Sequence, residues 1–121
     1  MLRIVVGGQI DKDKIFYKIK QLAGERVELE IKNDLDAALA MKNSEYDYYI
    51  GACNTGGGGA LAMAIALLGQ ENCSTLSMPG FIKDESFIKD EVHKGKKAFG
   101  FTAQHIDDVL PVLVKELLKN N

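Results

Sequence analysis

Short apolar segments alternate with helical patterns five times along this chain, and this alternation constrains its fold more than any other feature. Apolar residues recur at helical spacing after each of five strand-like segments, which are residues 2–6, 27–31, 48–52, 74–78 and 97–101. Strands joined by single helices pair in parallel, and the helices then cover both faces of the sheet. The sequence therefore predicts an α/β fold with a five-stranded parallel sheet.

One doubly wound domain accounts for the whole chain. Its 121 residues are enough for a single core and too few for two domains, so residues 1–121 form the predicted domain. Right-handed crossovers between five strands favour the flavodoxin-like strand order 2-1-3-4-5. In that order the first and third strands are neighbours, and the loops that follow them leave toward opposite faces. Ligands bind in the crevice at the carboxyl ends of such strands.

Residue types at the segment ends predict where the helices begin and end. Asn33 or Asp34 can cap the second helix, and Gly69 ends a helix of about three turns that follows the third strand. Thr102 caps the closing helix, in which Pro111 removes one backbone hydrogen bond. We expect a kink at this proline or a break in the helix before it, near residue 107.

Composition and charge exclude several classes of protein. A formal net charge of -2 gives no basic surplus for binding nucleic acid, and no apolar run is long enough to cross a membrane. The start of the chain has only a short apolar run before Gly7 and Gly8, so it lacks the long apolar region typical of a signal peptide. The two cysteines, Cys53 and Cys73, have neither CxxC spacing nor histidines at metal-ligand spacing. We therefore expect a cytoplasmic protein with reduced thiols, no metal site and no cofactor.

The two most glycine-rich loops follow the first and third strands, so the predicted strand order brings them together at the crevice. Four glycines in succession, residues 56–59, are unfavourable unless a ligand must approach the backbone N–H groups closely. Because these glycines lead into a helix, we expect them to bind a phosphate or carboxylate. Close packing of the alanine-rich helix on the sheet is the alternative explanation. The predicted ligand-binding residues in these loops are Gly7, Gly8, Gln9, Asn54, Thr55, Gly56, Gly57, Gly58 and Gly59.

Cationic side chains follow several strands at the same edge of the sheet. Lys83 follows the fourth strand and His105 begins the last helix, and both are predicted ligand-binding residues. The predicted strand order places His105 two strand spacings from the crevice, while His93 lies at the opposite edge, at the end of a helix. The other lysines near this edge are Lys12, Lys14 and Lys32. Each lysine alone is typical of a solvated surface, and only their grouping favours an anionic ligand.

Cys53 ends the third strand, directly before the glycine loop. Backbone N–H groups at the start of a helix lower the pKa of a cysteine in such a position, so Cys53 is a candidate base or nucleophile. Cysteine is also among the most buried residue types, and position alone favours a purely structural role.

A resemblance to the YhfU-like family of small bacterial proteins covers nearly the whole chain. It is carried by the segments NDLDAALAMKNSEYDYYIGACNTGGGGALAMAIALLG and KKAFGFTAQHIDDVLPVL. This family has no established activity, so the resemblance implies no reaction.

A second, local resemblance implies a catalytic role for Cys53. The group of ribose-5-phosphate isomerase B and galactose-6-phosphate isomerase is similar over the segment DYYIGACNTGGGGALAMAIALLG. In that group the matching cysteine is the base that moves a proton between two carbons of an open sugar phosphate, and Thr55, Gly56 and Gly58 match residues that hold the enediolate. This chain departs from the group at residues 7–9, where the group carries an Asp-His pair, and it lacks the group's phosphate-binding arginines.

Three functions are consistent with these features. The first is a binding module for a small anionic metabolite, the second is a sugar-phosphate isomerase-like enzyme with Cys53 as base, and the third is a structural subunit of a metabolic complex. The apolar helix at residues 60–68 must be buried within the subunit or packed against a neighbour. We therefore also expect a homo-oligomer, most simply a dimer.

Overall fold

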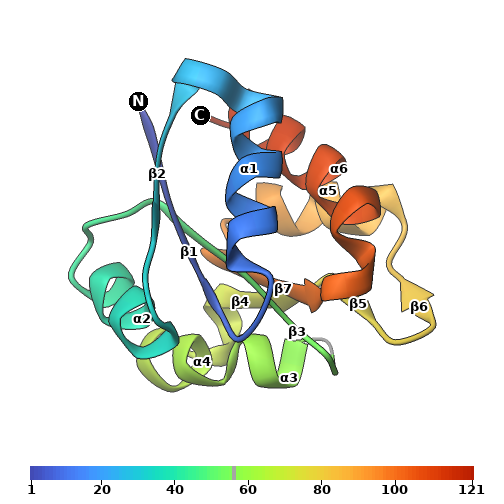
Figure 1. The fold of residues 1–121 in the computed structure, drawn as a ribbon, viewed down its shortest axis with the longest axis horizontal. Helices are drawn as coiled ribbons and strands as arrows, with labels where there is room; N and C mark the ends of the chain where they lie inside the picture. Colours follow the sequence, from blue (N-terminus) through green and yellow to red (C-terminus); the bar gives the residue numbers. More distant parts are fainter. Residues whose placement is uncertain (56) are drawn as a thin grey trace.

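A computed structural model of the chain, which describes residues 1–55 and 57–121, contains a five-stranded parallel sheet and a separate two-stranded hairpin (Figure 1). The strands of the sheet are β1 (Leu2–Gly8), β2 (Val27–Ile31), β3 (Tyr48–Cys53), β4 (Cys73–Thr75) and β7 (Ala98–Thr102). The hairpin consists of β5 (Ser77–Met78) and β6 (Phe81–Ile82). The α-helices are α1 (Lys12–Ala23), α2 (Asp34–Lys42), α3 (Gly57–Ala60), α4 (Ala62–Leu68), α5 (Glu85–His93) and α6 (Ile106–Lys119).

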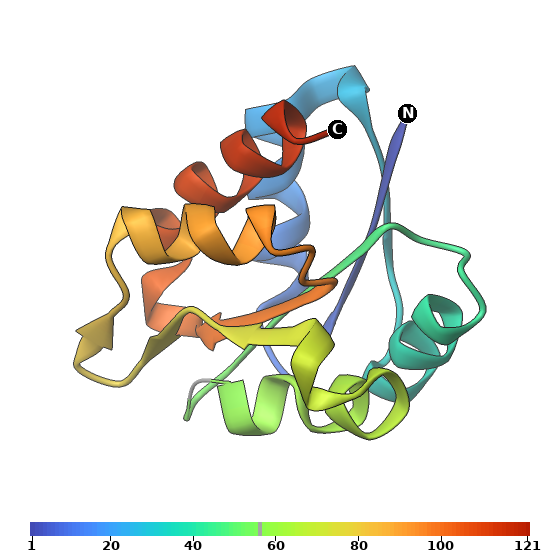
Figure 2. The ribbon, with the colours of Figure 1, turned by 180° about the vertical axis from the view of Figure 1, so that it is seen from behind.

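Helices cover both faces of the sheet, as the alternation of segments predicts. The helices α1, α5 and α6 lie on one face, and α2, α3 and α4 lie on the other (Figures 1 and 2). The core under the first group includes Ile4, Ile19 and Leu113, and the core under the second includes Tyr49 and Leu61, all of them buried. The predicted doubly wound α/β fold is confirmed.

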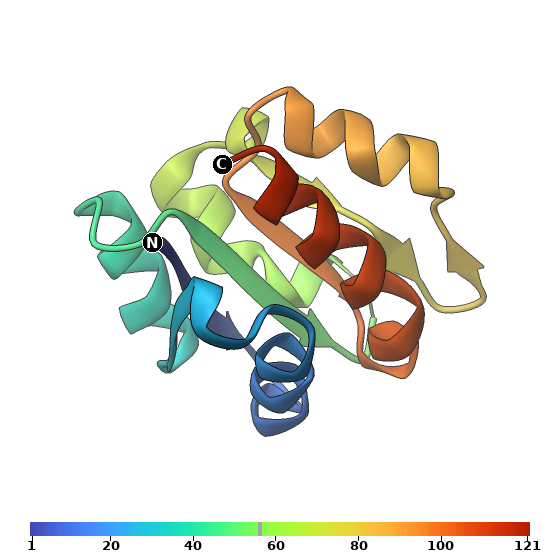
Figure 3. The same cartoon turned by 90° about the horizontal axis from the view of Figure 1, so that it is seen from above.

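The strand order is β2-β1-β3-β7-β4, so the predicted order is wrong at its last two positions. The strand that we expected fifth, β7, lies between β3 and β4. All five residues of β7 are buried, whereas β4 has three residues and includes the polar Ser74 and Thr75. A short, partly polar strand suits an edge, and a longer apolar strand suits the centre of a parallel sheet. Helix α5 consequently returns from β4 to β7 on the face of α1 and α6, as Figure 3 shows.

The segment predicted as one strand, residues 74–78, forms parts of two strands. The chain leaves the sheet after β4 and enters the β5–β6 hairpin, which extends away from the sheet (Figure 2) and whose turn is formed by Pro79 and Gly80. Gly80 has a φ angle of 76°, which glycine adopts without strain. The break lies at Leu76, between β4 and β5, and the apolar pattern of residues 74–78 does not reveal it.

The helix predicted after the third strand is broken at Leu61. Two shorter helices, α3 and α4, replace it, and Leu61 between them has φ and ψ angles of -110° and 2°. The Leu61 side chain packs onto β7 at Gly100, where an added Cβ would lie 2.6 Å from Leu61 Cγ. Docking of Leu61 on this glycine accounts for the break. The predicted end of the helix at Gly69 is confirmed.

The closing helix begins later than predicted and continues through its proline. A 3-10 helix, η3 (Ala103–His105), precedes α6, so Thr102 does not cap it, and the break predicted near residue 107 is wrong. The helix tolerates Pro111 because one missing hydrogen bond is outweighed by the buried apolar face that packs on the sheet. No helix in residues 1–55 and 57–121 has the length and hydropathy needed to span a membrane.

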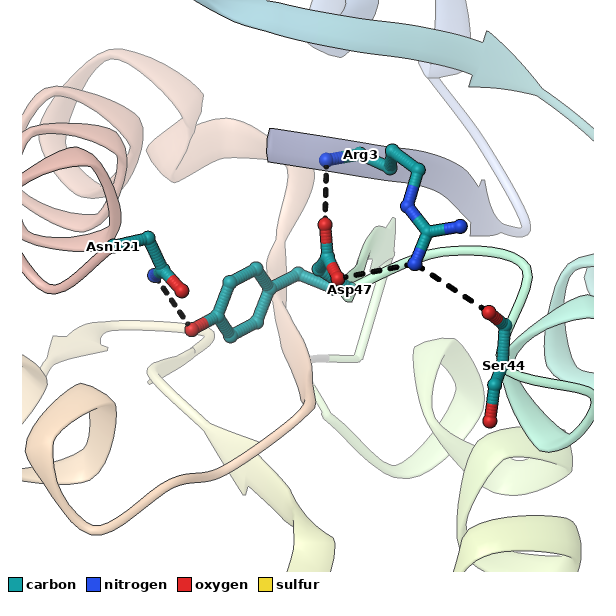
Figure 4. A network of polar contacts seen from close by, with 5 residues as sticks. Arg3, Ser44, Asp47 and Asn121 are labelled. Carbon is teal, nitrogen blue, oxygen red and sulfur yellow. Dashed lines mark hydrogen bonds and ion pairs between the residues drawn. The ribbon is translucent and has the colours of Figure 1, made fainter. Parts of the chain in front are cut away.

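Arg3 and Asp47 join β1 to the segment that precedes β3, at the amino edge of the sheet (Figure 4). The Asp47 carboxylate accepts hydrogen bonds from the Arg3 N–H at 2.8 Å and from the Arg3 guanidinium at 3.3 Å, and this guanidinium also donates to the Ser44 carbonyl oxygen. Burial raises the pKa of Asp47, but these hydrogen bonds and the guanidinium charge outweigh burial and lower the pKa below its ordinary value. Nearby, Asn121 Nδ2 donates to Tyr48 Oη at 2.9 Å.

Candidate functional site

The observed strand order creates a point of diverging connections on each side of β3. The chain leaves β1 and β7 toward the face of α1 and α6, whereas it leaves β3, which lies between them, toward the face of α2 and α4 (Figure 1). Connections that diverge in this way form a crevice at the carboxyl ends of the strands. The loop that contains His105 is therefore one strand from β3, not two as predicted.

The loops after β1 and β3 lie in contact, as the order of the first three strands requires. The N–H groups of Gln9 and Ile10 donate to the Ala52 carbonyl oxygen at 2.9 and 3.4 Å. A Cβ added to Gly59 would lie 3.0 Å from Gln9 Oε1 and 3.2 Å from Cys53 Sγ. The absence of a side chain at Gly59 thus lets α3 approach both loops closely.

Gly7 and Gly8 are surrounded by the protein's own atoms. A Cβ added to Gly7 would lie 2.5 Å from the Tyr49 ring, and one added to Gly8 would lie 2.7 Å from the Ala52 backbone nitrogen. Close packing of β1 against β3 therefore explains why both residues are glycine. The predicted contact of these two residues with a ligand stays a prediction.

Tyr49, which we did not single out from the sequence, joins three segments of this region. Its fully buried hydroxyl accepts a hydrogen bond from the Gly8 N–H at 2.8 Å. The same oxygen lies 2.5 Å from Asp34 Oδ1 and 2.7 Å from the Ala60 carbonyl oxygen, and the hydroxyl proton is shared between these two acceptors. Burial, with the nearby Asp34 carboxylate, raises the pKa of Tyr49 well above its ordinary value.

Cys53 lies buried at the end of β3, and several hydrogen-bond donors surround its sulfur. The Thr55 hydroxyl oxygen is 3.6 Å from Cys53 Sγ. Burial raises the pKa of this thiol, but hydrogen bonds from the Thr55 hydroxyl and from the N–H groups of Thr55, Ala60 and Gly59 together lower the pKa below its ordinary value. Negative charge is thus stabilised at the sulfur, and the N–H groups of Gly59 and Ala60 point toward it.

The remaining glycines of the loop are described only in part. Gly56, a predicted ligand-binding residue, lies outside the described residues. Gly57 and Gly58 form the first turn of α3. Predicted ligand contacts of these glycines stay predictions.

Asn54 lines a hollow of about 620 Å³ between the starts of α1 and α6. The charged residues of its lining are Asp11, Asp13, Lys14 and Asp107. Carboxylates outnumber ammonium groups there, so this hollow disfavours an anion. The lysine predicted to attract an anion, Lys14, is therefore set among acidic side chains.

Thr55 and Lys83, both predicted to bind the ligand, line a second hollow of about 340 Å³. This hollow follows β4 at the edge of the sheet and is bounded by α4 and α5. Lys83 Nζ lies 4.8 Å from the centre of the Phe87 ring and 5.4 Å from that of Phe81. The ammonium group is thus held near two aromatic rings at the hollow's edge.

Glu91 contributes a carboxylate to the same hollow, but its charge is already engaged. One Glu91 oxygen accepts a hydrogen bond from Ser74 Oγ at 2.7 Å, and the other lies 3.4 Å from Lys94 Nζ. The described apolar residues of this lining are Leu61, Ile65, Met78 and Phe87. The hollow therefore combines an apolar wall with one lysine and several uncharged polar residues, which are Thr55, Gln70, Ser74 and Thr75.

Two of the other predicted cations have partners away from both hollows. Lys12 Nζ donates to the Lys32 carbonyl oxygen at 3.2 Å, and Lys32 Nζ pairs with the Glu30 carboxylate at 3.2 Å. These lysines tie the end of β2 to the start of α1, and they do not gather around a common point.

His105 faces the hairpin. Its Nδ1 lies 2.8 Å from Ser77 Oγ, which also accepts a hydrogen bond from the Thr102 N–H at 3.0 Å. His93 lies at the opposite edge as predicted, with Nε2 2.9 Å from a Glu116 oxygen. Within the part of the chain that the structure describes, no three His, Cys, Asp or Glu side chains are grouped to hold a metal ion.

Comparison with known proteins identifies the family. The model of a family described as "Protein of unknown function DUF2620" matches residues 2–117. Three relatives are each named "Uncharacterized protein YhfU", and they come from Escherichia coli K12, from Escherichia coli O6:H1 strain CFT073 and from Shigella flexneri. Each is 38% identical to this chain over 117 residues, which cover 97% of this chain and 99% of the relative. No solved structure matches. None of these names carries an activity, and the resemblance to sugar-phosphate isomerases gains no support from them. The chain belongs to the DUF2620 family of proteins of unknown function.

Proposed function

We propose that the chain binds a small metabolite with a phosphate or carboxylate group in the hollow that Thr55 and Lys83 share. The observation that carries the proposal is that Thr55 and Lys83, from two separate loops, line one hollow of about 340 Å³ that runs along the edge strand β4. The Lys83 ammonium attracts an anion, and the Thr55 hydroxyl can donate its single proton to the anion if it turns away from Cys53 Sγ, which lies 3.6 Å from it. The apolar wall suits the carbon skeleton of a small ligand.

Charge favours this hollow over the larger one beside Asn54. Lys83 has no ion pair with a described residue, and the Glu91 carboxylate of the same hollow is bound by Ser74 and Lys94. The lining beside Asn54 carries three aspartates and one lysine. An anionic group is therefore more stable beside Thr55 than beside Asn54.

Thermal unfolding with a panel of anions tests the proposal. The panel contains inorganic phosphate, sugar phosphates and small carboxylates, and each is added to the wild type, to Lys83→Met and to the control Lys89→Met. Lys89 is exposed on the same helix as Phe87 and does not line the hollow. A ligand at 100 times its Kd adds about 2.7 kcal/mol to the free energy of unfolding, which raises Tm measurably.

We expect at least one anion to raise the Tm of the wild type and of Lys89→Met but not that of Lys83→Met. If no anion of the panel stabilises the wild type, or if Lys83→Met responds equally, the proposal is wrong.

The lowered pKa of Cys53 supports a second candidate, an enzyme that transfers a proton on a sugar phosphate. A larger fraction of such a thiol is ionised near neutral pH, as a general base requires. Because Cys53 is fully buried, residues around the sulfur must move before a substrate carbon reaches it. Exchange of the substrate's C–H proton with heavy water, followed by NMR, tests this candidate. Exchange that is lost in Cys53→Ser while anion binding persists supports the enzyme, and no exchange with any sugar phosphate rejects it.

Exposed apolar side chains on α2 and α4 support a homodimer. Such a dimer could act by itself or as a subunit of a larger complex. Leu35 and Leu39 on α2 are 50% and 40% exposed, and Met63 on the adjacent α4 is 39% exposed. One side of the apolar helix is thus left for a second copy of the chain to cover. Light scattering is expected to give a dimer for the wild type and a monomer for the Leu39→Glu, Met63→Glu double variant. A monomeric wild type at micromolar concentration rejects the dimer.

A further inference from the structure

A groove between the C-terminal halves of α1 and α6 has an apolar floor and a cationic rim. Its volume is about 570 Å³. The apolar residues that line it are Leu22, Pro111, Val114 and Leu118, and the charged residues that line it are Arg26, Lys115 and Lys119. Both helices end near the chain termini, at the amino edge of the sheet (Figures 1 and 2). The groove is therefore remote from the hollow of Thr55 and Lys83, and an inference about it does not depend on the proposed function.

The floor consists of apolar side chains that the packing of α1 against α6 leaves partly uncovered. Val114 is buried between the two helices, whereas Leu22, Pro111 and Leu118 are only half-buried. A side chain from outside the molecule that inserts between the helices would remove these three from water, which is favourable. The floor thus selects apolar groups in an occupant.

The rim is cationic. Asp47 lines an adjoining hollow with Arg26, but its carboxylate is bound by Arg3. The described lining contains no Asp or Glu, and neither Arg26, Lys115 nor Lys119 forms an ion pair with a described residue. Arg26 uses its Nε to donate to the Ala23 carbonyl oxygen at 3.4 Å. The whole chain carries a formal charge of -2, so this local concentration of positive charge departs from the average surface. The rim thus selects carboxylates in an occupant.

We propose that this groove docks an acidic amphipathic helix of a partner protein. Such a helix places apolar side chains in a stripe at i, i+3, i+4 and i+7, and acidic side chains can flank the stripe. The stripe fits the floor between α1 and α6, and the flanking carboxylates face the three cations. Unlike a free anion, this occupant satisfies the floor and the rim together.

A synthetic peptide provides the test. The probe is a fluorescein-labelled helical peptide with leucines at i, i+3, i+4 and i+7 and glutamates beside them, and its matched control has glutamine at every glutamate. Fluorescence anisotropy is measured with the wild type, with the groove variant Arg26→Gln, Lys115→Gln, Lys119→Gln, and with a control variant. The control variant changes three exposed lysines outside the groove: Lys20→Gln, Lys42→Gln and Lys89→Gln.

We expect saturable binding of the glutamate peptide to the wild type and to the control variant. The groove variant, or the glutamine peptide, should weaken binding about ten-fold, which is the sum of three modest surface ion pairs. Leu118→Gln should weaken binding of both peptides because it makes the floor polar. Amide NMR shifts on addition of the glutamate peptide are expected at Leu22, at Arg26 and along residues 112–119.

Three outcomes would overturn the proposal. The first is no saturable binding of the glutamate peptide up to millimolar concentration, and the second is equal affinity for the wild type and the groove variant. The third is binding to vesicles of anionic lipid that the groove variant abolishes, with no binding of the peptide, because this result identifies a membrane and not a protein as the occupant.

Discussion

Removal of the Tyr49 hydroxyl is the change that best tests how the crevice is held together. Tyr49→Phe keeps the ring that packs against Gly7, so it creates almost no change in volume. It removes the single oxygen that contacts the Gly8 N–H, the Ala60 carbonyl oxygen and the Asp34 carboxylate. The segments that lose their common partner are the end of β1, the end of α3 and the start of α2.

The magnitude follows from which of these groups water can reach. Gly8 and Ala60 are buried, whereas Asp34 is half-exposed and can be hydrated instead. A buried polar group left without a partner costs about 1–3 kcal/mol, so we expect Tyr49→Phe to lower the free energy of unfolding by about 3 kcal/mol. This is a large fraction of the roughly 5–15 kcal/mol that stabilises an ordinary domain.

Urea unfolding followed by circular dichroism measures this loss. With a slope of about 2 kcal/mol per molar urea, a loss of about 3 kcal/mol lowers the unfolding midpoint by about 1.5 M. Tyr48→Phe is the matched control, because the Tyr48 hydroxyl contacts only the exposed Asn121 among the described residues, and its removal should cost less than about 1 kcal/mol. Equal midpoints for the two variants would refute the reasoning.

Three further changes test other parts of the structure. Asp47→Asn should lower the free energy of unfolding near neutral pH but not in acid. The lowered pKa of the Asp47 carboxyl stabilises the fold above about pH 4, and this stabilisation is lost as the pH falls through the pKa of the folded state. Urea titrations at several pH values check this, and a difference in stability between wild type and variant that stays the same at every pH contradicts it. Gly100→Ala should lower the free energy of unfolding by about 1–3 kcal/mol, because the added Cβ would lie 2.6 Å from Leu61 Cγ. In a double-mutant cycle, Leu61→Ala should recover part of this loss. Strict additivity of the two changes in stability would argue against the contact. Cys53 should ionise at lower pH than Cys73, because burial raises the pKa of Cys73 to about 11. The ultraviolet absorbance of the thiolate, followed against pH in Cys73→Ser and in Cys53→Ser, measures each thiol separately. Ionisation of Cys73 at lower pH than Cys53 would contradict the assignment.

The fold class could be predicted because each strand and helix carries a local pattern, but the strand order could not. Right-handed crossovers are possible whether β7 lies inside or outside β4. The strand order depends on which of β4 and β7 is longer and more apolar, and this difference cannot be read from the pattern of apolar residues. Leu76 and Met78 extend the apolar pattern of β4 across a point where the chain leaves the sheet, so β4 seemed as long as β7.

The position of Thr55 was predictable because its loop follows directly from the end of β3, whereas Lys83 reaches the same hollow only through the β5–β6 hairpin. The role of Tyr49 was not predictable, because its partners are two backbone groups and one carboxylate that only the tertiary structure brings together. The prediction that the lysines gather around one ligand failed for Lys12 and Lys32 for a related reason. Lys12 and Lys32 follow strand ends as expected, yet nearby acceptors set the directions of their side chains.

The position of β7 and the hairpin together explain why Lys83 and Thr55 line the same hollow. Insertion of β7 separates β4 from β3, so a loop that simply followed β4 would start farther from the glycine loop. Leu76 compensates at the point where the chain leaves the sheet: its N–H donates to the Gly100 carbonyl oxygen at 2.8 Å, and its carbonyl oxygen accepts from the Lys83 N–H at 3.0 Å. The hairpin thus begins and ends at the sheet and returns Lys83 to the edge of β4. The hollow beside Thr55 is therefore a product of the strand order and the hairpin, neither of which a pattern of single residues specifies.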